Sequence, residues 1–337
     1  MVPRRLPLVL PINGNGRESG KGILMARRRT AAAPPTSSAG SASRLLITLA
    51  ILGLVAGIVL VGVSGFLTYR VVTTRNDTET ITPASYLLSN FESVNFTNPA
   101  GEEHEGWLLL GLKGAPVIVL CHGYNSNRSE LLPLGTLLRD NHFNVYLFNF
   151  QGPKTGAAFS NLGVREADDL VAALQTITKR PDVNAQRVGV YGVSAGGYAA
   201  LLAAQRSPLV KALVVENIYD NPDQMLEFQI DQLLGGSSRM FHFLTRTEFH
   251  LLGGRALSVR NQATFAKLAG VPKLFISSRE TAPLAELTES LYREVPPPKR
   301  LLVLEHSQSG SASDEEKLEH KNQILSFFLQ DLPLRAD

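Results

Sequence analysis

The residues with the clearest chemical meaning are Gly192-Val193-Ser194-Ala195-Gly196-Gly197. They follow the apolar stretch 188–191 and open the alanine-rich stretch 198–204, so the serine falls between an expected strand and an expected helix. In a G-x-S-x-G elbow a strained turn exposes the hydroxyl, and the glycines let strand and helix pass closely. The N-terminus of the helix adds partial positive charge where an oxyanion develops. The spacing therefore predicts Ser194 as a nucleophile and Gly192 and Gly196 as its elbow glycines.

A second turn could complete the site for an oxyanion. Leu120-Cys121-His122-Gly123-Tyr124-Asn125-Ser126-Asn127 follows another apolar run. We expect the backbone N–H groups of Tyr124 and Ala195 to hold the oxyanion. His122 and Gly123 are interpreted as structural residues of this turn. Cys121 is the single cysteine, and at the end of an apolar run it is typical of a small buried hydrophobe rather than a nucleophile.

The elements that position these turns are strands alternating with helices, which is typical of a mostly parallel, doubly wound α/β sheet with helices on both faces. A longer helical insertion, 217–268, is rich in Leu, Phe and Gln and could lie over the mouth of the site. Its phenylalanines could favour acyl chains or form the insertion's own core contacts. The expected strands are 92–97, 106–110, 116–121, 145–150, 188–191, 211–215, 273–277 and 300–304, and the expected helices include 128–140, 163–179 and 195–206.

From these motifs the sequence resembles the α/β-hydrolase superfamily, and within it the serine-aminopeptidase-like bacterial serine hydrolases. The resemblance covers about residues 90–330 and is closest over Pro116–Gly197. It implies an α/β-hydrolase fold with a short helical cap, an acyl-enzyme mechanism and no cofactor. It also implies a triad in the order Ser, acid, His, with the acid after the seventh strand and the histidine after the eighth.

The acid and the histidine depart from the family pattern. Thr281 occupies the usual acid position and Glu280 precedes it, so Glu280 is the candidate acid, with Asp220 in reserve. The alternative is that Glu280 pairs with Arg279 or another cation. His306 lies slightly before the usual histidine position. A shortened turn could bring it to Ser194 as the base; otherwise it is a surface histidine on a serine-rich loop.

The N-terminal part has a different composition. Residues 1–44 carry a net charge of +7, which leaves −4 on the remainder of a chain with a total of +3. The tail is expected to be disordered and cytoplasmic, and Met25 is an alternative start. Residues 45–69 contain no charged residue and are long enough for one transmembrane helix. The positive-inside rule predicts that the domain at 85–337, after a linker at 70–84, is extracytoplasmic.

Three alternatives stay open for the N-terminal segment and its partners. Residues 45–69 could instead be a cleaved signal, which would release a secreted enzyme. Gly53 and Gly57 have the GxxxG spacing that permits dimerisation, although glycine is common in such helices. Because the basic charge belongs to the tail, no nucleic-acid partner is expected for the domain. No metal-ligand spacing or phosphate-binding loop is present in the sequence.

Two functions follow from the sequence. The first is a membrane-anchored serine hydrolase that cleaves a small-molecule carboxylic ester, or alternatively a peptide or other amide. Ser194 would attack, His306 would transfer the proton, and Glu280 would orient the imidazole. The second is a catalytically inactive domain of the same fold that acts as an extracytoplasmic binding module. The distance between the Ser194 hydroxyl and the His306 ring distinguishes the two.

Overall fold

The computed structural model describes residues 39–73, 81–86, 90–150, 159–253, 262–306 and 311–334. Contacts within the chain divide it into residues 1–54 and residues 55–337. The described part of the first unit is the beginning of helix α1 (Ala39–Val72). The remaining elements belong to the second unit, which carries the predicted nucleophile.

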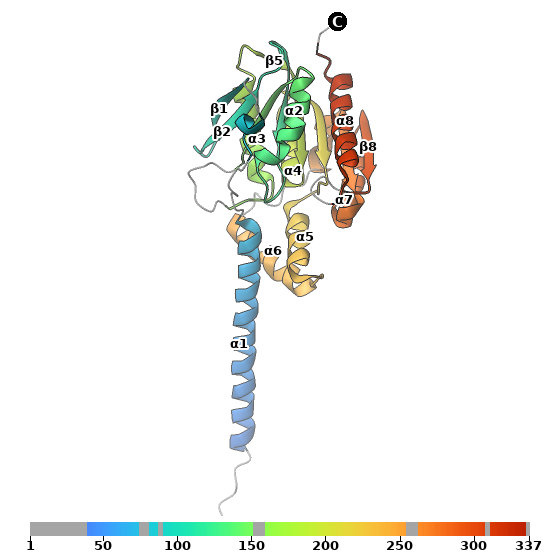
Figure 1. The fold of residues 1–337 in the computed structure, drawn as a ribbon. Coiled ribbons are helices and arrows are strands. Elements are labelled where there is room, and N and C mark those ends of the chain that lie inside the picture. Colours follow the sequence, from blue (N-terminus) through green and yellow to red (C-terminus); the bar gives the residue numbers. More distant parts are fainter. Residues whose placement is uncertain are drawn as a thin grey trace, which may run out of the picture. The chain divides into compact units, whose positions relative to one another are not determined.

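The second unit is built on one eight-stranded sheet with the order β1-β2-β4-β3-β5-β6-β7-β8 (Figure 1). The pairs β1–β2 and β2–β4 are antiparallel, and the pairs from β4 to β8 are parallel. Every residue of β3 is buried, as is typical of a central parallel strand covered on both faces. The strands are β1 (Phe91–Thr97), β2 (Glu103–Leu109), β3 (Ala115–Cys121), β4 (Asn144–Phe148), β5 (Val183–Val193), β6 (Val210–Glu216), β7 (Lys273–Ser278) and β8 (Lys299–Leu304).

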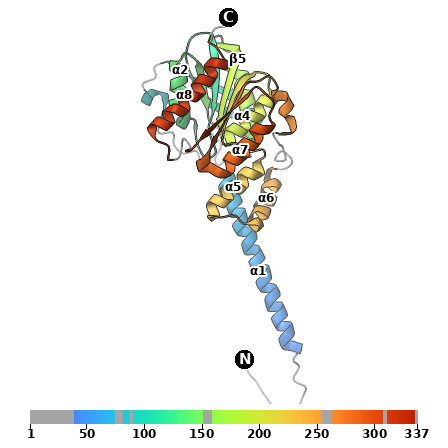
Figure 2. The same ribbon diagram turned by 90° about the vertical axis from the view of Figure 1, so that its right-hand side faces the viewer.

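Helices cover both faces of the sheet and bury two separate cores. One core includes residues of α3 (Val164–Ile177), α4 (Ala195–Arg206) and α7 (Ala282–Glu294). The other includes residues of α2 (Leu132–Asp140) and α8 (Asp314–Asp331), which lie on the opposite face (Figure 2). The predicted mostly parallel sheet with helices on both faces is therefore confirmed.

The described part of the predicted insertion 217–268 contains two α-helices, α5 (Pro222–Leu234) and α6 (Arg239–Gly253), and a 3-10 helix, Gln262–Leu268. Asn221 caps α5, because its side chain accepts from the Gln224 N–H and Pro222 occupies the first helical position. Gly235 ends α5 in the left-handed conformation, with φ 68°. We call α5 and α6 the cap.

One helix among the described residues, Gly40–Val72, is long and apolar enough to cross a membrane, with a mean hydropathy of 2.8 over its most apolar window. The predicted span 45–69 lies inside it. The helix continues to Val72, so it includes the first residues of the predicted linker 70–84. Its last turns belong to the second unit, where Leu67 and Val71 are buried in the core.

Candidate active site

Ser194 lies at the junction of β5 and α4 in a strained backbone conformation, with φ 53° and ψ −120°. A positive φ is uncommon for a residue with a side chain and marks stored strain. The Ser194 N–H donates to the Glu216 carbonyl at 2.8 Å, and its carbonyl accepts from the Tyr198 N–H at 2.9 Å. These two bonds help to hold the turn between the strand and the helix.

The elbow leaves no room for side chains at its glycines. A Cβ on Gly192 would lie 2.4 Å from the carbonyl oxygen of Gly196. A Cβ on Gly196 would lie 2.3 Å from the carbonyl oxygen of His122. Because both obstacles are backbone atoms, they cannot move aside as a flexible side chain would. The close approach of strand, turn and helix therefore depends on glycine at both positions.

The His122–Tyr124 turn lies against the nucleophile. A Cβ on Gly123 would be 3.7 Å from the Ser194 Cβ. His122 Nδ1 donates to the Gly123 carbonyl at 2.9 Å, and Nε2 accepts from the Phe150 N–H at 3.2 Å. Both ring nitrogens are occupied by backbone groups, which is a structural role for this histidine.

The backbone on both sides of Ser194 is suited to stabilising an oxyanion. Ala195 is the first residue of α4, where N–H groups have no acceptor within the helix. Tyr124 lines the same cavity as Ser194, a hollow of about 660 Å³. Its other lining residues include Glu216, Met225, Phe228 and Thr281. Burial raises the pKa of Tyr124 to about 12, so its phenol stays neutral.

The predicted base lies elsewhere. His306 is exposed and lines a second cavity with Glu316 and His320, and it is not among the residues that line the Ser194 cavity. Its Nδ1 lies 2.8 Å from Glu316 Oε1. This hydrogen bond with Glu316 raises the pKa of His306 above its usual value. Among the described residues no hydrogen bond involves the Ser194 hydroxyl.

The two candidate acids have other hydrogen-bond partners among the described residues. Glu280 Oε1 accepts from the Ser311 N–H at 3.2 Å and from its hydroxyl at 3.1 Å. The carboxylate on His306 in this structure is therefore that of Glu316. Asp220, the reserve acid, is buried at the start of the cap, where its N–H donates to Gln224 Oε1 at 2.8 Å. It is not a lining residue of the Ser194 cavity.

A buried polar cluster beside the Ser194 cavity was not predicted from the sequence. Glu216 Oε2 accepts from the Tyr191 hydroxyl at 2.8 Å and lies 2.8 Å from His320 Nε2. Glu216 and Tyr191 line the Ser194 cavity, whereas His320 lines the second one. Burial acts to raise the pKa of Glu216, but His320 and the two hydrogen bonds outweigh it, and the pKa is lowered. The only sequence signal was an acid at the carboxyl end of the 211–215 strand.

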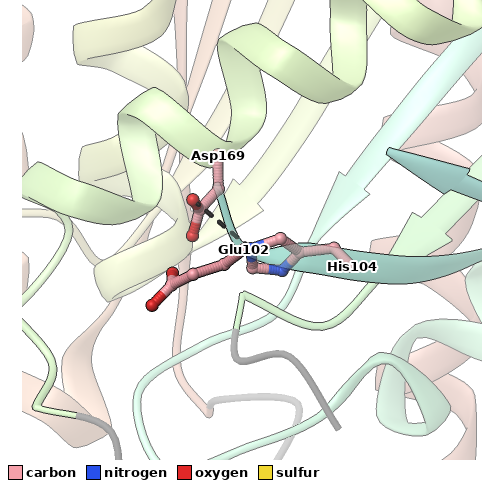
Figure 3. Close-up of side chains that lie close together, drawn as sticks. All are labelled: Glu102, His104 and Asp169. Atoms are coloured by element: carbon pink, nitrogen blue, oxygen red, sulfur yellow. Dashed lines mark ion pairs between the residues drawn. The ribbon is translucent and has the colours of Figure 1, made fainter. Parts of the chain in front are cut away.

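A second acid–histidine group lies near the β1 edge of the sheet. There, Glu102 and His104 on the β1–β2 hairpin meet Asp169 of α3 (Figure 3). The ligand atoms are close enough to hold a metal ion. However, Asn98 Nδ2 donates to Glu102 Oε2 at 2.9 Å and to Asp169 Oδ1 at 2.7 Å, and Arg165 pairs with Glu102. Existing donors thus satisfy both carboxylates, which favours a structural cluster.

The His104–Asp169 contact is a neutral one. His104 Nε2 lies 3.6 Å from Asp169 Oδ1 and has no hydrogen-bond partner among the described residues. Burial lowers the pKa of His104 and raises the pKa of Asp169 from 3.8 to about 8. Both groups are therefore uncharged near neutral pH, because this separation is too long for a bond that would offset the loss of solvation.

Comparisons with known proteins agree with this fold. A family model described as "alpha/beta hydrolase fold" matches residues 116–326. An uncharacterised Escherichia coli K12 protein, YfhR, is 26% identical over 251 residues, which cover 72% of this chain and 81% of that protein. A thiohydrolase of Aspergillus aculeatus, aneE, is 24% identical over 37% of this chain and 40% of its own.

Two solved structures share the fold at low identity. The Pyrococcus furiosus esterase Pf2001 superimposes with a TM-score of 0.62 at 18% identity, over 78% of this chain and 98% of its own. The Pyrococcus horikoshii acylaminoacyl peptidase has a TM-score of 0.55 at 18% identity, over 77% of this chain and 45% of its own.

Proposed function

Because the chain belongs to the alpha/beta hydrolase fold family, we propose that it is a serine hydrolase that cleaves carboxylic esters through an acyl-enzyme on Ser194. The observation that carries the proposal is the elbow itself. Ser194 has a strained positive φ at the start of α4, lines a cavity and lies beside the Gly123 turn. Backbone strain maintained at a cavity wall is typical of a catalytic residue.

In the proposed reaction the ring of His306 turns from the second cavity toward Ser194, the Ser194 hydroxyl oxygen attacks the ester carbonyl, and its proton passes to His306. The N–H groups of Tyr124 and Ala195 stabilise the resulting oxyanion, and the alcohol leaves with the proton from His306. Water then attacks the acyl-enzyme and gives up a proton to His306, which returns it to the Ser194 oxygen as the acid leaves and so restores the Ser194 hydroxyl. Glu316 holds Nδ1 in the structure, so it joins Glu280 as a candidate for orienting the ring.

The lining of the cavity is the reason to propose ester cleavage, because the named relatives and neighbours include both an esterase and a peptidase. The relatives and structural neighbours include an esterase, a thiohydrolase and an acylaminoacyl peptidase. Met225 and Phe228 of α5 supply apolar surface close to Ser194 in the cavity lining. Apolar lining suits the acyl or alkyl part of an ester, because it removes that part from water.

We also propose that α1 anchors the enzyme in a membrane. The helix satisfies the length and hydropathy of a span, and its apolar side chains are exposed, unlike those of a core helix. The arginine-rich tail precedes the helix, so the positive-inside rule places that tail in the cytoplasm and the hydrolase domain outside it. Protease accessibility of the domain in sealed, inverted membrane vesicles tests this topology.

A second candidate function is supported by the position of His306. The histidine and Ser194 line different cavities, so the described structure lacks the hydrogen bond that activates a serine. In this alternative the domain is an extracytoplasmic binding module. It retains the elbow and the cavity, and it binds a small molecule without cleaving it.

Labelling of the membrane fraction with a fluorophosphonate probe distinguishes the two functions. The hydrolase proposal expects covalent labelling that is lost in Ser194→Ala. Ser126→Ala is the matched control, because Ser126 lines the same cavity and should leave labelling intact. Folded wild-type protein that resists labelling over the range of concentrations that labels other serine hydrolases contradicts the proposal and supports the binding module.

A further inference from the structure

Helix α6 carries an exposed apolar stripe. Met240, Phe243 and Leu251 have 48%, 64% and 80% of their surface exposed. They recur at helical spacing, and Thr247 between them bonds its hydroxyl to the Phe243 carbonyl at 2.7 Å. Thr245 and Phe249 of the same helix are buried. The spacing places the stripe on the side of α6 opposite these two residues, facing away from the hydrolase core.

Three basic or titratable side chains of α6 are paired with α5. His242 Nε2 lies 2.6 Å from Asp231 Oδ1, and His250 Nε2 lies 2.8 Å from Asp223 Oδ1. Arg246 likewise pairs with a glutamate of α5, at 3.8 Å. All three contacts are made with α5. They use the polar side of α6 to fasten the cap together and leave the apolar side without a protein partner among the described residues.

Helix α6 also contacts the last turns of α1 (Figure 1). Glu248 Oε2 accepts from the Ser64 hydroxyl at 2.8 Å and from the Thr68 hydroxyl at 2.9 Å. Ser64 and Thr68 are buried by this contact, whereas neighbouring apolar residues of α1 such as Ile58 and Phe66 are exposed. Exposed apolar residues of α1 therefore lie close in the helix to the two residues that bond to α6.

The position of the contact along α1 fixes its height in a bilayer. A helix crosses the hydrocarbon core with about 20 residues, and the uncharged stretch of α1 ends at Arg70. Ser64 and Thr68 lie within the last turns before Arg70, at the level where hydrocarbon gives way to headgroups. Because Glu248 is bonded to both residues, α6 lies at this level as well.

We propose that the α6 stripe is seated in the headgroup layer of the bilayer that α1 spans, and that the enzyme takes long-chain acyl amphiphiles from that layer. This inference rests on the proposed hydrolase function and its membrane anchor. The occupant of the stripe is the lipid surface, because the helix that carries the stripe is bonded to α1, a helix long and apolar enough to cross a bilayer. Amphipathic helices of this kind lie with their apolar face at the boundary of headgroups and acyl chains.

The cap links this surface to the cavity. Helix α5 supplies Met225, Phe228 and Gln229 to the cavity lining and is fastened to α6 through Asp223 and Asp231. The end of α1 also reaches the site, because the Tyr124 hydroxyl donates to the Val71 carbonyl at 2.8 Å. An amphiphile that leaves the bilayer beside α6 thus meets the apolar wall of the Ser194 cavity.

The surface is tested with an environment-sensitive fluorophore on Leu251→Cys in the full chain, reconstituted in phosphatidylcholine vesicles. The single native cysteine, Cys121, is buried, so the introduced thiol is the reactive one. Leu318→Cys on α8 is the matched control, since Leu318 is a leucine with 52% exposure outside the cap. We expect blue-shifted emission and slow quenching by aqueous iodide at position 251 and water-like emission at 318. Water-like emission at both positions overturns the proposal.

The substrate class is tested with Phe243→Ser/Leu251→Ser. Removal of two exposed apolar side chains that the proposal inserts into the bilayer should lower hydrolysis of p-nitrophenyl palmitate in vesicles by about tenfold or more. Hydrolysis of soluble p-nitrophenyl butyrate and fluorophosphonate labelling should stay unchanged. An unchanged ratio of the two esters overturns the assigned substrate class. Blue-shifted emission at position 251 without any labelling of Ser194 keeps the membrane surface and removes the hydrolase function instead.

Discussion

The nucleophile side and the histidine side of the candidate site are built in different ways. On the nucleophile side, Ser194, Gly192 and Gly196 are positioned by backbone atoms inside the fold. On the histidine side, His306 is exposed and held by a single side-chain contact with Glu316. The first arrangement cannot change without unpacking the sheet. The second depends on two solvated side chains, and such contacts add little to stability.

The difference between the two sides shows which part of the site is fixed by the fold and which part can rearrange. A backbone-built elbow fixes the reaction class that the fold can support. Because His306 is exposed, its ring can change from one carboxylate partner to another at a small cost in free energy. Its position in one structure therefore restricts the possible chemistry less than the position of Ser194 does. Variants on the histidine side should therefore affect activity strongly and stability weakly, and variants inside the core should do the opposite.

The largest effect is expected for His306→Ala. If His306 transfers the proton, its loss should slow fluorophosphonate labelling of Ser194 by about 100-fold or more. The midpoint of thermal unfolding should change little, because the side chain is exposed. Labelling rates and thermal unfolding of the purified protein measure both quantities.

Two further variants test which of the candidate acids orients the ring of His306. Glu316→Gln should slow labelling by about tenfold if Glu316 keeps its place on Nδ1, and Glu280→Gln should have that effect if the ring turns to Glu280. A His306→Ala protein that labels as fast as the wild type would show that the histidine side has no catalytic role.

The Tyr191–Glu216–His320 cluster should respond in the opposite way. His320→Ala removes one partner of a buried pair, and we expect it to lower the free energy of unfolding by about 3 kcal/mol. The pKa of Glu216 is lowered in the folded protein, so its contribution is present above the usual value of 4.5 and is lost as pH falls below that value. The difference between wild type and variant should shrink in this acidic range.

Urea unfolding from pH 7 down to pH 3 measures this difference. Tyr191→Phe is the control, because it removes a neutral donor and should cost about 1 kcal/mol. A difference for His320→Ala that stays constant over the whole pH range contradicts the assignment of an ionised Glu216.

The looser His104–Asp169 contact should give the reverse pH dependence. The pKa of Asp169 is raised to about 8, so the folded protein retains a proton that the unfolded chain releases above its usual 3.8. Wild-type stability should therefore fall as pH rises from about 4 to about 8. Asp169→Asn keeps an acceptor for Asn98 but cannot ionise, so it should lose this part of the pH dependence.

The same unfolding experiment, followed from pH 5 to pH 8, compares Asp169→Asn with wild type. Asp168→Asn is the control, since Asp168 is an exposed neighbour that pairs with Arg206 on the surface. Parallel stability curves for wild type and Asp169→Asn would contradict a neutral Asp169.

The sheet could be predicted because its signals are local. Apolar runs between polar turns predicted the eight strands, and the glycines around Ser194 predicted a turn whose backbone contacts the structure now supplies. Strand β5 was predicted too short, as 188–191, because Asn184, Gln186 and Arg187 are polar, so no continuous apolar run marks the start of the strand.

Contacts between distant side chains could not be predicted in this way. Glu216 and His320 are far apart in the sequence and meet only because α8 packs on the sheet beside β6. The partner of His306 was also hidden, since Glu316 belongs to the first turn of α8 and has a second role there as the capping-box residue of Ser313. Neither relation leaves a motif in the sequence.

The smallest effect is expected for Tyr124→Phe, which tests whether the nucleophile side is built from the backbone. The variant loses the bond from the hydroxyl to the Val71 carbonyl, so we expect a loss of about 1 kcal/mol in stability. Labelling of Ser194 should change by less than about threefold, because the proposed oxyanion donor is the N–H of Tyr124 and the substitution leaves it in place. Labelling that falls as far as in His306→Ala would mean that the phenol acts in the site, and the contrast between the two sides would no longer hold.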